Sequence, residues 1–169
     1  ALKRVFIAVN LPEGVKKDLE KTLDKIRPLF DSEIRFLSRE NWHLTIEFLA
    51  YQDDNSIALI SEALKRTAAE FEPPIVRFEK IIYGPPGKTP RMIWLTGSKE
   101  TSSALGKIKD FLEKAMFNLG VRFRQEHRLF NAHLTLARFE ATGKKELPLL
   151  EIPFQRELFR LIVHAGLEG

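Results

Sequence analysis

The chain has 169 residues, 44% of them hydrophobic and 30% charged, which is typical of one globular domain and excludes a disordered chain. Lys and Arg outnumber Asp and Glu by 27 to 23. The resulting net charge of +4 suits contact with phosphates but excludes a protein that coats nucleic acid with a strongly basic face. No cysteine is present, so the sequence offers neither disulfides nor thiolate ligands.

The apolar stretches are short. The run VFIAV near the beginning is too short for the core of a signal peptide, and no run approaches the length of a membrane span. We therefore expect a cytoplasmic protein that makes no membrane contact.

Strands and helices are predicted in an α+β order. Helical spacing of apolar residues predicts helices over 13–30, 53–71 and 101–120. Runs rich in β-branched and aromatic residues predict strands over 4–12, 34–38, 43–50, 74–84, 91–98, 121–124, 132–139 and 158–166. Asp53 and Asp54 favour N-terminal capping of the second helix over a metal-binding pair.

The sequence Asn-x-His-Leu-Thr occurs twice, at 41–45 and 131–135, although the chain has only four histidines. The two motif histidines lie 90 positions apart (133 − 43), about half the chain. This repetition indicates an internal duplication. No linker separates the halves, so we expect one domain over residues 1–169, made of two pseudo-symmetric lobes with helices packed on one side of each sheet.

The two motifs carry residues suited to acid–base chemistry. Alternate residues of a strand share a face, so His43 projects with Thr45, and His133 with Thr135. Imidazole donates or accepts a proton near neutral pH, and two imidazoles on opposite sides of a phosphorus centre are able to activate water and protonate a leaving oxygen. Hydroxyls would donate to the phosphoryl oxygens. Neither a metal nor a cofactor is required. The alternative is that each motif is a strand with polar residues on its exposed face.

Several stretches of the sequence resemble a known family. The paired His-x-Thr motifs, the opening RVFIAVNLP, and the stretches ENWHLTIEFLA and AHLTLARF are similar to the 2H phosphoesterase superfamily, most of all to the RNA 2',3'-cyclic phosphodiesterases, also called 2'-5' RNA ligases. The resemblance covers about residues 2–140. It implies a bilobed duplicated fold in which two antiparallel sheets face a central cleft that holds the active site, with the helices packed outside.

The resemblance also implies roles and a substrate. His43 would be the proton donor and His133 the proton acceptor, Thr45 and Thr135 would hold the phosphate, and Arg138 would bind it. The reaction implied is opening of a terminal 2',3'-cyclic phosphate of RNA to a 2'-phosphate. Joining or cleaving 2'-5' linkages in tRNA halves is an alternative, as is a non-catalytic module that binds nucleotides or RNA ends.

Arg138 conflicts with simple strand geometry. It lies five positions after His133, so on a regular strand the two side chains point to opposite faces. Arg138 reaches the site only if the strand ends or bulges near Ala137.

Other candidates are weaker. The segment 84–89 lacks the first glycine of a phosphate-binding loop and is predicted to be a turn. The arginines at 122, 124 and 128 either attract an RNA backbone or form a solvated edge, and both interpretations stay open. Trp42 and Phe48 are expected in the core rather than against a base.

Two further expectations concern the remaining histidines and the C-terminal region. His127 and His164 have no Thr partner and are expected to be incidental. The predicted strand 158–166 has no second strand after Gly166, so we expect an open sheet edge there that favours association.

Overall fold

The computed structural model describes residues 1–31, 33–140, 147–158 and 163–168. The helices are α1 (Glu13–Ile26), α2 (Asp54–Glu70) and α3 (Lys99–Asn118), with short 3₁₀ turns η1 (Arg27–Leu29) and η2 (Arg39–Asn41). The strands are β1 (Lys3–Asn10), β2 (Arg35–Phe36), β3 (His43–Gln52), β4 (Val76–Gly84), β5 (Met92–Gly97), β6 (His133–Arg138), β7 (Glu151–Leu158) and β8 (Val163–Glu168).

The helices follow from their sequence patterns. On α1 the buried residues Val15, Leu19, Leu23 and Ile26 form one apolar stripe, and Pro28 stands in the 3₁₀ turn that follows. The side chain of Asp53 accepts a hydrogen bond of 2.8 Å from the backbone N–H of Ser56, which confirms the predicted cap of α2.

The strands form one antiparallel sheet in the order β7-β4-β5-β6-β3-β1-β8, with β2 also pairing with β6. The prediction of two separate sheets is therefore wrong. The reason is that the two motif strands, β3 and β6, pair with each other at Leu44 and Leu134 and so continue the hydrogen-bonded ladder across the centre. We call β3, β1 and β8 the β3 arm, and β6, β5, β4 and β7 the β6 arm.

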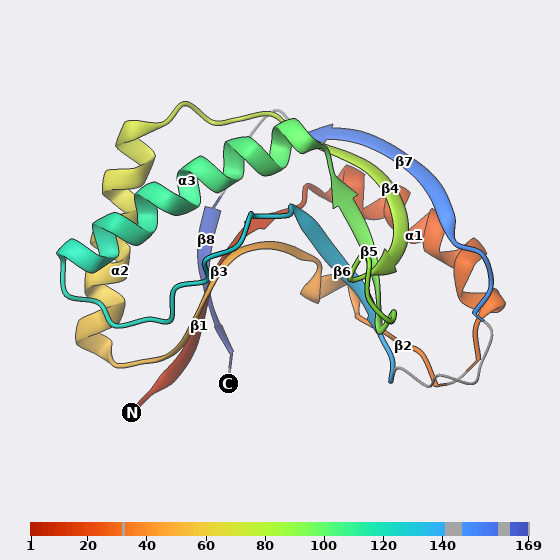
Figure 1. The fold of residues 1–169 in the computed structure, drawn as a ribbon, viewed down its shortest axis with the longest axis horizontal. Helices are drawn as coiled ribbons and strands as arrows, with labels where there is room; N and C mark the ends of the chain where they lie inside the picture. The colour runs from red at the N-terminus through yellow and green to blue at the C-terminus, as the bar shows by residue number, and fades with distance from the viewer. Residues whose placement is uncertain (32, 141–146, 159–162, 169) are drawn as a thin grey trace.

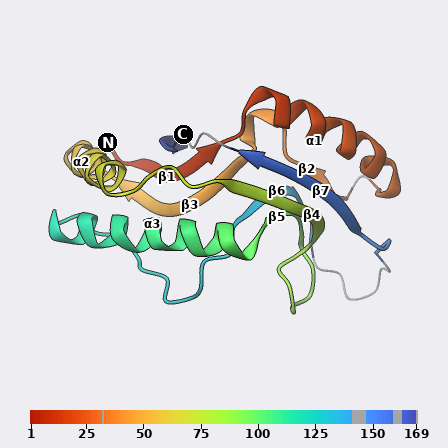
Figure 2. The same cartoon turned by 90° about the horizontal axis from the view of Figure 1, so that it is seen from above.

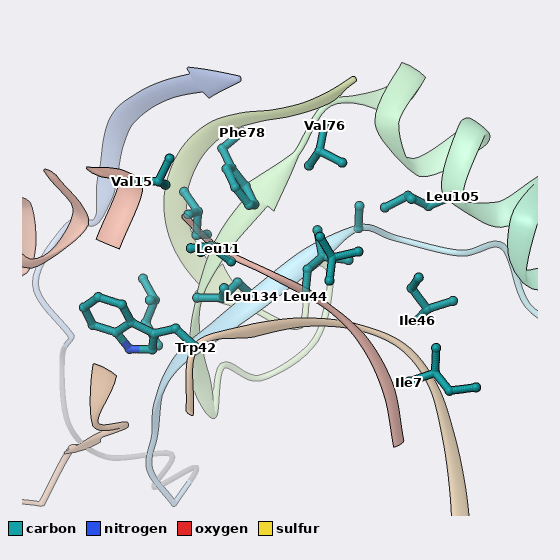
Figure 3. Close-up of a cluster of buried hydrophobic side chains, with 14 of the residues drawn as sticks. Ile7, Leu11, Val15, Trp42, Leu44, Ile46, Val76, Phe78, Leu105 and Leu134 are labelled. Carbon is teal, nitrogen blue, oxygen red and sulfur yellow. The ribbon is translucent and has the colours of Figure 1, made fainter. Parts of the chain in front are cut away.

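The helices divide between the arms. Figure 1 and Figure 2 show α1 at one end of the molecule, beside β7, and α2 with α3 at the other. An ion pair between Asp18 of α1 and Arg156 of β7 ties the first helix to the β6 arm. One continuous hydrophobic cluster runs through both arms, and Leu44 and Leu134 lie at its centre (Figure 3). Within the described part of the chain, no helix is both long and apolar enough to cross a membrane.

The C-terminal region differs from its prediction. In place of one strand over 158–166, β7 and β8 occupy opposite edges of the sheet, where β7 pairs with β4 and β8 with β1. Residues 159–162 of the predicted strand lie outside the described residues. β7 escaped prediction because it contains Pro153, which an edge strand tolerates although it cannot donate a ladder hydrogen bond.

The predicted strand 121–124 is also wrong, because this segment has no regular secondary structure. Val121 is buried, and the side chain of Gln52 donates a hydrogen bond to the carbonyl of Arg122 at 2.9 Å. The side chain of Gln52 thus occupies the carbonyl of Arg122, which in a sheet would accept a hydrogen bond from a neighbouring strand.

Candidate active site

The pairing of the two motif strands brings four polar side chains together. Leu44 and Leu134 are cross-strand partners and fully buried. Extending this antiparallel register by one residue on each side places His43 across from Thr135, and Thr45 across from His133. All four are half-buried and alternate with core residues, so they share the face opposite the core. Directly opposed side chains have Cβ atoms about 5 Å apart.

Both motifs are followed by a β-bulge at the same position. On β3, Thr45 pairs with Ala8 and Glu47 with Ile7, which leaves Ile46 as the extra residue. On β6, Thr135 pairs with Trp94 and Ala137 with Ile93, which leaves Leu136 as the extra residue. Residues 41–48 and 131–138 accordingly share one burial pattern, with two consecutive buried residues after each Thr. The repeat of the motif in the sequence is thus matched by a repeat in backbone geometry.

The second bulge removes the objection to Arg138. Because Leu136 and Ala137 are both buried, the alternation of faces shifts by one residue, and exposed Arg138 follows on the side of His133 and Thr135. Its charge is close enough to contribute to lowering the pKa of His133. Phe48 is the matching residue of the β3 arm; it is 60% exposed, so its predicted core position is wrong, whereas Trp42 lies in the core as expected.

His133 is tightly surrounded. Its ring stacks on the indole of Trp94, with 3.7 Å between ring centroids and 18° between planes. Its Nδ1 lies 2.8 Å from the carbonyl oxygen of Asn131. A carbonyl only accepts, so Nδ1 carries the proton and Nε2 of the neutral ring keeps a lone pair. Burial lowers the pKa of His133, the charges of Arg128 and Arg138 lower it further, and the bond to Asn131 acts in the opposite direction.

His43 has a more apolar neighbour. Its ring centroid lies 5.5 Å from that of Phe6, with the planes tilted by 39°, and Phe6 in turn lies 6.5 Å from Phe48. Phe6 and Phe48 are also register partners between β1 and β3. An aromatic pair therefore flanks the first imidazole, whereas a cationic side chain flanks the second.

Three residues around His133 were not predicted from the sequence: Trp94, Asn131 and Gly84. A Cβ added at Gly84 would lie 2.4 Å from Cδ2 of Trp94, so the bare backbone of β4 touches the indole. The repeated Asn of the two motifs was a visible signal for Asn131, although its backbone carbonyl makes the contact. Nothing local in the sequence places the Trp94 ring against a strand that begins 39 positions later (133 − 94).

The arginines at 122, 124 and 128 do not share one strand face, because residues 121–124 form no strand. Arg122 and Arg124 are exposed in an irregular segment, and Arg128 forms an ion pair with Glu126 at 3.1 Å. His127 is exposed in the same segment, and His164 lies in β8. The segment 84–89 runs from the end of β4 into a turn and opens no helix, as expected.

A buried charged cluster lies behind the first motif. Glu47 is 3% exposed, and burial, followed by a hydrogen bond with Glu113 of α3, raises its pKa to about 9 against the opposing charge of Lys109. Lys109 and Glu113 are 3.9 Å apart on successive turns of α3. Glu47 of the folded protein is therefore protonated at neutral pH and shares its proton with a second carboxyl group.

A pocket of about 200 Å³ lies on the helix side of the β3 arm, not between the motif histidines. It is lined by Ile7 and Ile46 of the sheet and by residues of α2, α3 and the segment after α2. Among the described residues, no group of three or more His, Cys, Asp or Glu side chains is placed to hold a metal ion.

The family follows from comparison with known proteins. Residues 9–94, just over half of the chain, match the model of the LigT like Phosphoesterase family. The chain belongs to this family. It is 27% identical to the RNA 2',3'-cyclic phosphodiesterase of Bacillus subtilis over 150 residues, covering 89% of this chain and 78% of the relative. It is 28% identical to that of Thermotoga maritima over 148 residues, covering 88% and 76%.

Solved structures share the fold. The protein TT0787 of Thermus thermophilus superposes with a TM-score of 0.77 at 24% identity, covering 96% of this chain and 86% of that one. Escherichia coli LigT complexed with 3'-AMP gives a TM-score of 0.61 at 21% identity, covering 100% and 97%. This chain thus shares its overall fold with these structures, LigT among them.

Proposed function

We propose that this protein hydrolyses terminal 2',3'-cyclic phosphates of RNA to 2'-phosphomonoesters by acid–base catalysis with His133 and His43, without a metal. The observation that carries the proposal is the register of β3 against β6, whose extension from Leu44–Leu134 sets His43 across from Thr135 and Thr45 across from His133 on one face. The matching bulges support the interpretation of the arms as related copies within one domain over residues 1–169.

His133 suits the role of general base. A base must be neutral before the reaction, and burial together with two nearby arginines favours the neutral imidazole. The proton on Nδ1 is directed at Asn131, so Nε2 takes the proton of the attacking water. The water oxygen then forms a bond to phosphorus.

His43 is assigned the complementary step. As the P–O3' bond breaks, protonated His43 donates its proton to the departing 3' oxygen, which leaves the phosphate on the 2' oxygen. Thr45 and Thr135 donate hydrogen bonds to the non-bridging oxygens, and Arg138 offsets their charge. The choice of the 3' oxygen as leaving group rests on the family resemblance. Exchange with solvent afterwards returns a proton to His43 and removes one from His133.

The relatives named above support an RNA substrate, and the complex of Escherichia coli LigT with 3'-AMP supports a nucleotide-sized site. Cleavage or joining of 2'-5' linkages uses the same groups on a different ester. A binding module without turnover is the contrasting alternative. It has no need of a neutral, oriented imidazole.

Identifying the product of a nucleoside 2',3'-cyclic phosphate by phosphorus NMR tests the proposal. We expect a 2'-phosphate, with activity that survives chelator treatment and is lost in His43→Ala and His133→Ala. His127→Ala, which removes an exposed histidine, is the matched control. A 3'-phosphate product would reverse the assigned leaving group, and binding without turnover would favour the non-catalytic module.

The pH dependence of kcat/KM provides a second test. His133 must be neutral, and its pKa lies below the ordinary value of 6.5. The midpoint of the acidic limb of the profile should therefore lie below pH 6.5. The requirement for protonated His43 should close the profile on the alkaline side and give a bell shape.

A further inference from the structure

The indole of Trp94 lies between the backbone of one strand and the imidazole of another. On one side the centroid of its ring system is 3.7 Å from that of His133, with nearly parallel planes. On the other side Gly84 presents no side chain, and a Cβ there would fall 2.4–2.8 Å from three atoms of the indole. Trp94 is only 7% exposed, so the ring is held in this place by the surrounding sheet.

The register explains this alignment. Trp94 pairs with Ile82 of β4 and with Thr135 of β6, so Gly84 and His133 are its diagonal neighbours on the two flanking strands. Diagonal neighbours on one face are within reach of an aromatic side chain. Any residue larger than Gly at 84 would occupy the position of the indole and push it toward His133.

The stack adds a restraint that the hydrogen bond does not give. The bond from Nδ1 to the carbonyl of Asn131 fixes one atom of the imidazole, but the ring remains able to rotate about that contact. A flat surface against one face removes this rotation. Together the two contacts leave Nε2 in a single direction, and extending the Leu44–Leu134 register by one residue places Thr45 across from His133.

The indole of Trp94 includes a polar group whose burial is unfavourable. Its Nε1 is buried and has no hydrogen-bond partner among the described residues. Burying an unpaired donor is unfavourable, and a phenylalanine would avoid it. Local costs of this kind are expected where a residue serves a site rather than the fold alone.

We propose that Trp94, seated on the bare backbone of Gly84, is a positioning residue that fixes the His133 imidazole so that Nε2 faces the reacting phosphate. This rests on the proposed function for its catalytic consequence, but the positioning itself is a property of the folded protein and is measurable without substrate. Gly84 acts through Trp94, and neither residue takes or gives a proton.

The experiment compares Trp94→Phe with Trp94→Met, because both replacements fill a similar volume but only Phe keeps a flat face. We expect Trp94→Met to lower kcat by about 10- to 100-fold, as misplacement of a reacting group does, with KM nearly unchanged, and Trp94→Phe to restore most of the rate. Gly84→Ala should resemble Trp94→Met. Gly14→Ala is the matched control, since a Cβ there has its nearest neighbour at 3.9 Å.

The second readout is the nitrogen NMR spectrum of the His133 ring across pH, assigned with His133→Gln. In the wild-type protein we expect one tautomer, protonated at Nδ1. In Trp94→Met and Gly84→Ala we expect a mixture of tautomers and a changed titration midpoint. Adding Gly84→Ala to Trp94→Met should have little further effect, because the two changes act through one contact.

The outcomes separate the two proposals. An unchanged tautomer and kcat in Trp94→Met would overturn the positioning role, as would a Trp94→Phe protein as slow as Trp94→Met. If the wild-type protein fails to open cyclic phosphates, the proposed function is wrong, and the NMR comparison still decides whether Trp94 orients His133. Should Gly84→Ala not fold, the comparison of Phe with Met at position 94 is sufficient.

Discussion

The β3 arm and the β6 arm carry the same motif on the same backbone but surround it differently. In each arm a half-buried His and Thr precede a bulge, two buried residues and one exposed residue. The exposed residue is Phe48 in the β3 arm and Arg138 in the β6 arm. The two backbones thus supply two similar positions, and the side chains around them make one flank apolar and the other cationic.

The buried positions of the two arms also differ. Behind the first motif Glu47 shares a proton with Glu113, whereas the matching residue of the second motif is Ala137. The two imidazoles differ too, since His43 neighbours Phe6 and His133 is stacked, hydrogen-bonded and close to two arginines. Two similar backbone positions therefore carry two chemically distinct histidines, as the proposed acid–base hydrolysis requires.

The largest test of this difference uses the histidines themselves. His43→Ala and His133→Ala should each lower the rate on a cyclic phosphate by roughly 10²–10⁴-fold. On a phenyl ester whose phenol departs without a proton, His43→Ala should recover much of its rate, while His133→Ala should stay slow because water still needs a base. Steady-state kinetics on both substrates decides the matter. Recovery in the His133 variant instead would exchange the roles, and equal losses on both esters would mean that the histidines only bind phosphate.

The cationic flank provides the next test. Arg138→Met should raise KM for a cyclic phosphate by about 10- to 100-fold, because a hydrogen bond to a charged group contributes about 1.5–3 kcal/mol. Arg138→Lys should recover only part, since Lys lacks the two-pronged geometry. Arg122→Met and Arg124→Met serve as controls on small substrates. If the Arg122 and Arg124 variants weaken binding only when the substrate is a longer RNA, the irregular segment 121–131 contacts the RNA backbone. An Arg138→Met protein with normal KM would exclude Arg138 from the site.

The buried pair behind the β3 arm should affect stability rather than rate. Glu47 has a pKa of about 9 in the folded protein and a value near 4.5 when unfolded, so only the folded chain keeps the proton between these pH values. The free energy of unfolding should therefore fall as pH rises from about 4.5 to about 9. Glu47→Gln retains a donor for Glu113 without ionising, and should raise the stability at pH 8.5 by about 1–3 kcal/mol.

Thermal unfolding of Glu47→Gln across pH measures this effect. The variant should lose most of its advantage near pH 4.5 and show a flatter dependence than the wild-type protein. Glu140→Gln removes an exposed carboxyl group and is the control. Parallel curves for the wild-type protein and Glu47→Gln would show that Glu47 ionises normally.

The repeated Asn should give the smallest effects and still distinguish the arms. Asn131 contacts His133 through its backbone carbonyl, so Asn131→Ala should keep activity within about threefold, less than the loss of one neutral hydrogen bond. The side chain of Asn41 instead hydrogen-bonds Ser38 at 3.1 Å, and Asn41→Ala should lower stability by about 0.5–1 kcal/mol. Unfolding midpoints and rates of the two variants test this; a large rate loss in Asn131→Ala would give its side chain a role in the site.

The sequence predicted what depends on local pattern. The three helices and the strands carrying the motifs follow from periodicity and from the choice of residues, and the family resemblance followed from the repeat. The paired His and Thr of each copy also followed, because alternation on a strand decides which side chains share a face. Arg138 required one extra condition, a bulge, and the register of β5 against β6 provides it.

The features that the sequence did not predict depend on which strands pair with each other in the sheet. The pairing of β3 with β6 joins residues 90 positions apart. No local sequence pattern predicts that this pairing joins the strands of the two arms into one sheet. The segment 121–124 alternates like a strand, but its backbone is engaged by Gln52. β7 contains a proline that argues against a strand unless its edge position is known. The contact of Trp94 with His133 is of the same long-range kind.

The positions of β7 and β8 also limit how far the molecule can open. These strands form the two outer edges of the sheet, yet only four residues of the chain separate Leu158 from Val163. Laid flat, seven strands would hold the edges about 29 Å apart, whereas this short length of chain spans about 18 Å at most. The chain therefore acts as a tether that keeps the arms bent toward each other about the single pair Leu44–Leu134, so the angle between the two histidine-bearing strands is restrained by covalent length as well as by packing.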